Sequence, residues 1–152
     1  MHKLVVIAED LRSIYNVGSL FRTCDAAKVD KLFLTGRSAH PPHPRLVKTA
    51  LGSHQTVPWE YHLTSSEIIP ILKAEGYTIL GMEYTSSSTS LFALDLPEAC
   101  CLVLGNEVTG LSQDVLSLAD TICHIPMLGT KSSLNVSVAA GVAIYQYRKR
   151  DL

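Results

Sequence analysis

Residues 100–112 read CCLVLGNEVTGLS, an apolar run that breaks off at Gly105 and reaches a second glycine at position 110. The run is typical of a buried strand, and a strand that ends in glycine near a helix start commonly borders a ligand site in α/β proteins. The spacing matches neither G-x-G-x-x-G nor G-x-x-x-x-G-K-[ST], which argues against a dinucleotide fingerprint or a P-loop. The turn also carries Glu107, which a phosphate cradle would avoid. A tight surface turn with an incidental carboxylate is the alternative interpretation.

Strand-like and helix-like runs alternate along the rest of the chain. The pattern predicts strands at 3–8, 31–35, 77–84, 100–105 and 121–125, and helices at 17–28, 45–51, 65–75, 112–119 and 132–149. Such alternation favours an α/β fold, a mostly parallel sheet flanked by helices.

Length and composition predict one compact domain over residues 1–152, with no appended RNA-binding domain. Thirteen basic and fourteen acidic residues give a net charge of −1, so any surface for a polyanion must be local. The four cysteines form no C-x-x-C pair, which indicates reduced thiols and no zinc site. The apolar start of the chain is too short for a signal peptide or membrane span, and we expect a cytoplasmic protein without metal.

The stretch YNVGSLFRTCDAAKV, residues 15–29, has the apolar periodicity of an amphipathic helix with Asn16 as its N-cap. Gly18 and Arg22 share the opposite face with Asp25. A glycine early in a helix is costly and suggests close approach of another group to its backbone. Arg22 is either functional or a partner of Asp25 in an exposed ion pair.

The stretch HIPMLGTKSSLNVSVAAGVAIYQYRKR, residues 124–150, predicts a strand end, a loop at Gly129 and a helix from Ser132 or Ser133. This helix is apolar around most of its circumference and is therefore expected to be buried on all sides. Either a partner subunit covers one face or the helix is central in the monomer. Asn135, one turn inside it, would need polar partners and is a candidate site residue.

The three stretches together resemble the SpoU (TrmH) family of RNA 2'-O-ribose methyltransferases, members of the SPOUT class, over essentially the whole chain. The family motif N-x-G-x-x-x-R is matched by Asn16, Gly18 and Arg22, and G-x-E-x-x-G-[LI] by Gly105, Glu107, Gly110 and Leu111. The third motif, I-P-M-x-G followed by S-L-N-V-S-x-A, is matched by Ile125, Pro126, Met127, Gly129, Ser133, Leu134, Asn135, Val136, Ser137 and Ala139.

The resemblance implies a C-terminal deep trefoil knot whose loops bind S-adenosylmethionine. It implies a homodimer through the knot and the C-terminal helix, in which motif-one residues of one subunit reach the cofactor of the other. The cofactor-binding residues implied are Leu104, Gly105, Asn106, Glu107, Gly110, Ile125, Pro126, Met127, Gly129, Ser133, Leu134 and Asn135.

The family chemistry is an in-line attack of a ribose 2'-oxygen on a sulfonium methyl group, which needs alignment and removal of a proton. The catalytic residues implied are Arg22, Asn16, Glu107, Ser133 and Asn135. Arginine is a poor base because its pKa lies above about 12, so we expect Arg22 to anchor a phosphate, with base action as the alternative.

The substrate class that we expect is tRNA, with rRNA as a possible alternative. Candidate RNA-binding cations, which are equally compatible with simple solvent exposure, are Arg12, Arg37, Arg45, Lys48 and Lys131. Two further hypotheses stay open: a SPOUT enzyme that methylates a base, and a non-catalytic RNA-binding module.

Overall fold

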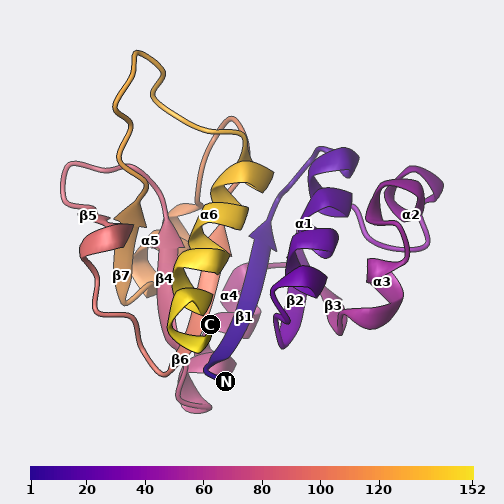
Figure 1. Ribbon diagram of the computed structural model, residues 1–152, viewed down its shortest axis with the longest axis horizontal. Coiled ribbons are helices and arrows are strands. Elements are labelled where there is room, and N and C mark those ends of the chain that lie inside the picture. The colour runs from indigo at the N-terminus through magenta and orange to yellow at the C-terminus, as the bar shows by residue number, and fades with distance from the viewer.

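The computed structural model describes residues 1–152 and contains one seven-stranded sheet (Figure 1). The strands are β1 Lys3–Glu9, β2 Lys31–Thr35, β3 Trp59–His62, β4 Thr78–Met82, β5 Thr89–Ser90, β6 Ala99–Leu104 and β7 Thr121–His124. Their order is β3-β2-β1-β6-β4-β7-β5, and every pairing is parallel. The predicted parallel α/β sheet is thereby confirmed.

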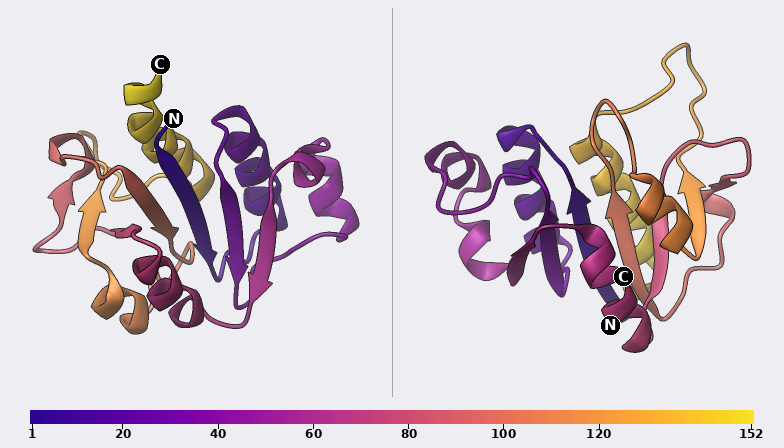
Figure 2. Two further views of the ribbon diagram at one scale, coloured as in Figure 1. Left: turned by 90° about the horizontal axis from the view of Figure 1, so that it is seen from below. Right: turned by 180° about the vertical axis from the view of Figure 1, so that it is seen from behind.

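Helices cover both faces of this sheet. They are α1 Ile14–Ala26, α2 Pro44–Ala50, α3 Ser53–Thr56, α4 Ser65–Ala74, α5 Gln113–Leu118 and α6 Val136–Arg148, with 3₁₀ turns η1 Leu91–Ala93 and η2 Lys149–Asp151. Figure 2 shows α1 and α6 on one face and α4 and α5 on the other, while α2 and α3 lie beside α1. None of the helices combines the length and hydropathy needed to span a bilayer.

The sheet divides the interior into two hydrophobic clusters. Along β1, Val6 and Ala8 join the cluster under α1 and α6, whereas Val5 and Ile7 join the cluster under α4 and α5. Strands buried on both faces read as continuous apolar runs, which is why β1 and β6 were evident in the sequence. The four cysteines are all buried and unpaired.

Three short elements were missed by the sequence analysis: α3, β3 and β5. Strand β3 lies at the sheet edge, and its segment WEYH is largely exposed, so it lacks the hydrophobic run that marks an inner strand. Strand β5 has only two residues, too few for any periodic signal.

Two predicted helix starts were wrong. Helix α1 begins at Ile14 because the Ser13 side chain caps it by accepting a hydrogen bond from the backbone N–H of Asn16, so Asn16 lies inside the first turn. Helix α6 begins at Val136, not near 132, because Asn135 is its N-cap and accepts from the backbone N–H of Ser137 at 2.9 Å. The apolar pattern could not distinguish a capping loop from a helical turn.

The expectation that α6 is buried on all sides is not met within one chain. Its inner face, Ala140, Ala143 and Ile144, is fully packed. Its outer face leaves Val138 about half exposed, at 51%, and Tyr145 similarly exposed, at 45%. The uncovered face is therefore available to another molecule.

The expectation that another group approaches the backbone of Gly18 is confirmed. A Cβ built on Gly18 would lie 2.6 Å from the Cβ of Thr49, which belongs to α2. Helix α2 therefore packs directly against the glycine, and Gly18 is buried although it lies opposite the main apolar face of α1.

Arg148 connects the end of α6 to the start of the chain and to the segment that follows α1. Its side chain is only 4% exposed. Its guanidinium donates to the carbonyl oxygens of Ala27 at 2.8 Å and Lys28 at 2.6 Å, to that of His2, and to the Asp151 carboxylate at 3.1 Å. A buried charge with all three guanidinium nitrogens hydrogen-bonded holds three segments in one arrangement.

We predict that Arg148→Leu lowers the free energy of unfolding by about 3 to 5 kcal/mol, because it leaves several buried acceptors without a donor. Lys149→Leu, the exposed neighbouring position, should change it by less than about 0.5 kcal/mol. Urea unfolding followed by circular dichroism measures both. Equal effects for the two variants would contradict this role for Arg148.

Candidate active site

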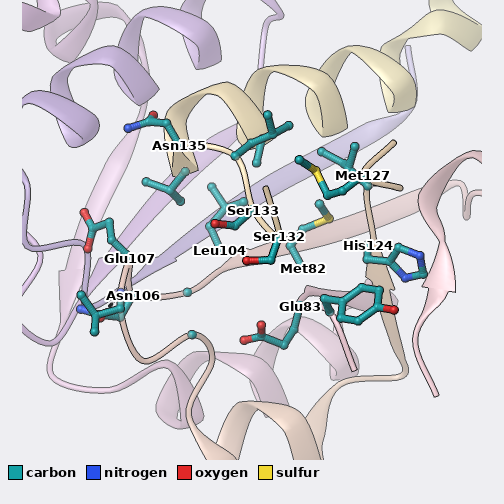
Figure 3. A pocket seen from close by; sticks show the side chains of 18 residues that line it. Met82, Glu83, Leu104, Asn106, Glu107, His124, Met127, Ser132, Ser133 and Asn135 are labelled. Atoms are coloured by element: carbon teal, nitrogen blue, oxygen red, sulfur yellow. Dashed lines mark hydrogen bonds between the residues drawn. The ribbon is translucent and has the colours of Figure 1, made fainter. Parts of the chain in front are cut away.

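A cavity of about 620 Å³ lies at the carboxyl edge of the sheet, where the segments after β4, β6 and β7 meet the start of α6. Figure 3 shows Glu107 and Asn135 at one end of this pocket and His124 and Met127 at the other. The carboxyl ends of parallel strands are the usual place for ligands in open α/β sheets.

Most of the residues expected to bind a cofactor line this one pocket. They are Leu104, Gly105, Asn106, Glu107, Gly110, Ile125, Met127, Ser133, Leu134 and Asn135. Pro126 and Gly129 belong to the same loop but are not part of the lining. Two motifs separated along the chain therefore form a single cavity.

The sequence analysis missed several lining residues. They are Met82 at the end of β4 and Glu83 and Tyr84 after it, together with Val108, His124, Ser132, Val136 and Ala139. A signal for the β4 group was available, because a predicted strand ended there. The adjacency of β4 to β6 and β7, however, depends on the strand order, which the sequence did not specify.

Two carboxylates hold the turn after β6 in place. Glu83 accepts a hydrogen bond from the backbone N–H of Leu111 at 2.9 Å. Glu9, a buried residue, accepts from the backbone N–H of Ser112 at 2.9 Å and from its hydroxyl at 2.8 Å. In an ordinary surface turn, water would accept the hydrogen bonds of such backbone N–H groups. Here the two carboxylates accept them.

The two glycines of this turn are required by close packing. Gly110 has φ +71°, and a Cβ there would overlap a Glu83 carboxylate oxygen. A Cβ on Gly105 would lie 2.6 Å from the backbone of Gly110. The turn folds back on itself too tightly for a side chain at Gly105, and the left-handed backbone beside Glu83 favours glycine at position 110.

Glu107 joins the turn to the start of α1. Its Oε1 accepts from the backbone N–H of Ser13 at 3.2 Å and from the Asn16 amide at 3.1 Å, and its Oε2 accepts from the backbone N–H of Arg12 at 3.3 Å. Asn16 in turn accepts from the amide of Asn135 at 3.2 Å. We call this chain of contacts the Glu107–Asn16–Asn135 bridge. It links all three sequence motifs, so the carboxylate is not incidental.

The hydrogen bonds of the bridge keep Glu107 ionised. Partial burial by itself raises the pKa of this carboxyl group. The bonds from its own backbone N–H, from Asn16, Ser13 and Arg12 outweigh that effect and lower the pKa below its ordinary value. A negative charge is thus fixed at one end of the pocket.

Arg22 does not reach the pocket of its own chain. It lies six residues beyond Asn16, roughly 9 Å further along the axis of α1, and its side chain is exposed. The alternative ion pair with Asp25 is not formed, and Asp25 accepts a hydrogen bond from Thr56 of α3. Of the five expected catalytic residues, Glu107, Ser133 and Asn135 line the pocket and Asn16 contacts two of them, whereas Arg22 stands apart.

Comparison with known proteins identifies this arrangement. Residues 3–145 match the SpoU rRNA Methylase family. The chain belongs to this family. The SpoU resemblance seen in the three motifs is confirmed by a match that covers nearly the full chain.

Individual SpoU-type relatives agree with this assignment. The chain is 30% identical to the tRNA (guanosine(18)-2'-O)-methyltransferase of Escherichia coli K12 over 97% of its length and 63% of that protein. It is 32% identical to the enzyme of the same name from Thermus thermophilus, covering 98% of this chain and 76% of that one. The SpoU methyltransferase AviRb from Streptomyces viridochromogenes, solved in complex with the cofactor AdoMet, superposes with a TM-score of 0.90 at 27% identity, covering 99% and 58% of the two chains.

The chain thus spans under two thirds of the length of the Escherichia coli relative. The aligned 97% of this chain includes the residues that line the pocket and those of the three motifs.

We predict that Glu107→Gln lowers the free energy of unfolding by about 1 kcal/mol, because an amide cannot accept every bond of the bridge. A lowered folded-state pKa contributes stability that is present above the unfolded pKa, near 4.5, and is lost as the pH falls through the folded pKa. Wild-type stability should therefore decline more steeply than that of Glu107→Gln below about pH 4.5. Urea unfolding measured from about pH 3 to about pH 7, roughly the range of carboxyl titration, tests this. The variant Glu67→Gln, at an exposed position, is the control. Parallel slopes for wild type and Glu107→Gln would count against the bridge.

Proposed function

We propose that this SpoU-family protein is an S-adenosylmethionine-dependent RNA methyltransferase that modifies a ribose 2'-hydroxyl of tRNA. The observation that carries the proposal is the pocket itself, which gathers the second and third motifs and is joined to the first by the Glu107–Asn16–Asn135 bridge. The names of the two tRNA-modifying relatives and the AdoMet complex of AviRb support it. The family description leaves rRNA as the alternative substrate.

The pocket fits an adenosyl cofactor in size and chemistry. Its volume of about 620 Å³ lies within the range of roughly 300 to 1,000 Å³ that is usual for small-molecule sites. Apolar side chains such as Met82, Leu104 and Met127 suit an adenine ring, and the carboxylates of Glu83 and Glu107 suit a cation. When bound, the cofactor supplies a methyl group on a positively charged sulfonium.

The chain's own residues align and activate the nucleophile in this proposal. Glu107 and Asn135 hold one wall of the pocket rigid through the bridge, which limits the entropy lost on alignment. Ser133, exposed in the pocket lining, is free to contact the ribose. Arg22 anchors the neighbouring phosphate and favours loss of the hydroxyl proton, since its own pKa is too high for efficient base catalysis.

A second copy of the chain supplies Arg22 in this proposal. Arg22 is exposed and remote from the pocket of its own chain, so that pocket is incomplete alone. Helix α6 offers a surface for the second copy, with Val138 and Tyr145 on its exposed stripe and the exposed Leu134 in the loop before it. A Cβ on Gly141 of the same stripe would meet no atom within 4 Å. A small residue at an open site permits close approach of another helix.

One expectation from the family and two from length and composition remain predictions. They are the trefoil knot of the C-terminal segment, a cytoplasmic location, and one domain over residues 1–152.

We predict that Ala139→Leu weakens binding of S-adenosylhomocysteine at least tenfold, because Ala139 lines the pocket and a larger side chain fills it. Ala26→Leu, at an exposed position of α1, should bind as the wild type does. Isothermal calorimetry measures affinity. A hundredfold excess of ligand over its Kd should stabilise the wild type by about 2.7 kcal/mol. Undiminished affinity in Ala139→Leu would place the cofactor elsewhere.

We predict that Arg22→Ala reduces methyl transfer to unmodified tRNA by about 100-fold or more while cofactor affinity is retained. Mixing Arg22→Ala with Ala139→Leu should restore activity to about one quarter of wild type, since half of the randomly paired dimers then hold one complete site. Single-turnover transfer of labelled methyl, before and after subunit exchange, measures this. No recovery on mixing would mean that Arg22 serves its own chain, and full activity of Arg22→Ala would refute its catalytic role.

A further inference from the structure

Positive charge is concentrated in one continuous segment, residues 31–59. The segment contains no Asp or Glu, although the chain as a whole has fourteen acidic residues. It carries Lys31, Arg37, Arg45 and Lys48, together with three of the six histidines. It forms β2, α2, α3 and the start of β3, at one end of the sheet (Figure 1). A protein with a net charge of −1 thus has a local basic surface.

Most of these cations are not neutralised. Lys31 is paired with Glu60, but Arg45 and Lys48 are exposed and form no ion pair. The Arg37 guanidinium lies 3.8 Å from Asp10 and its side chain remains 66% exposed, so this contact holds it only weakly. The exposed cations can therefore contact phosphates.

Three aromatic rings gather beside Arg37. The ring of His40 lies over Trp59, with centroids 6.1 Å apart and planes 25° apart, and 4.7 Å from the ring of Tyr61. The Tyr61 hydroxyl donates to the carbonyl oxygen of Gly36 at 2.7 Å, directly before Arg37. His40 and Tyr61 are exposed, Tyr61 to 38%, while Trp59 packs against the core. We call His40, Trp59 and Tyr61 the aromatic platform.

Hydrogen bonds fix the platform relative to the pocket. Asp10 accepts from the backbone N–H of Arg37 at 2.8 Å, and its carbonyl accepts from the Asn106 side chain in the pocket wall at 2.8 Å. Ser38 binds the backbone of Leu11 and Ala8. Three strand spacings separate β3 from β6, or roughly 14 Å. At this distance the platform cannot touch a nucleotide that is methylated in the pocket, but it can reach the nucleotides next to that one.

We propose that His40 and Tyr61, with Arg37 beside them, form a stacking surface for unpaired nucleotides that flank the methylated residue. The inference rests on the proposed function, because it takes RNA as the substrate. Exposed aromatic faces stack on bases of any sequence, and adjacent cations bind the connecting phosphates. A double helix cannot use the rings, because its bases are already stacked within the duplex.

The experiment uses Trp59, the only tryptophan, as a reporter inside the platform. Single-stranded oligouridylate should quench Trp59 fluorescence, whereas the same strand paired with oligoadenylate should not. By fluorescence anisotropy, Tyr61→Leu and His40→Ala should each weaken single-strand binding about tenfold and leave duplex binding nearly unchanged. Arg37→Gln should weaken both and reduce the salt dependence by roughly one phosphate contact.

Two control variants separate stacking from folding. Tyr61→Phe keeps the ring and should bind as the wild type does, and Phe92→Leu removes an exposed ring from η1 and should have no effect. Absence of Trp59 quenching, equal loss of single-strand and duplex binding, or a Tyr61→Phe defect as large as that of Tyr61→Leu would overturn the inference. Calorimetry with S-adenosylhomocysteine separates the two proposals. If S-adenosylhomocysteine binds but single-stranded oligouridylate does not bind the platform, only the stacking surface is refuted. If S-adenosylhomocysteine does not bind, the proposed function is refuted.

Discussion

The parallel pairing of β1 with β6 places loops that are nearly a hundred residues apart side by side at the carboxyl edge of the sheet. In this register Ala8 lies opposite Leu104, so residues 10–13 emerge beside the turn that begins at Gly105. The contacts of Asn106 with Asp10 and of Glu107 with Ser13 both cross this junction. Without that pairing neither the pocket wall nor the start of α1 would have its present position. The apolar side chains on both faces of the two strands stabilise the pairing.

Polar groups at this edge are arranged to hold loops and not to pack a core. Glu9 and Glu83 bind backbone N–H groups of the turn, and Glu107 binds those before α1. The hydrogen bonds to Glu107 lower the pKa of its carboxyl group, and loss of any of these three carboxylates would leave its donors unpaired. The same bonds that define the pocket therefore also resist its deformation. Preorganisation of this kind is what an alignment-dependent displacement requires.

Two features of the chain fit the proposed association of two copies. Arg22 is exposed and remote from the pocket, and α6 presents Val138 and Tyr145 to solvent. Both features fit the proposed exchange of Arg22 between subunits, because an interface on α6 would lie beside the bridge at Asn135. The basic segment and its aromatic platform lie at the far end of the sheet from β7 and β5, where they remain free for RNA in that proposal.

The sequence by itself determined the parallel α/β class, the inner strands and the three motifs, because continuous apolar runs and tightly spaced glycines leave a strong local signal. It also indicated most of the pocket lining, through the resemblance carried by the motifs. Tertiary structure alone decided which strand ends are neighbours, and so brought Glu83 and His124 into the pocket. It also showed that Asn135 caps α6 and that Arg22 stands apart. Those facts depend on contacts between distant segments, which no local pattern encodes.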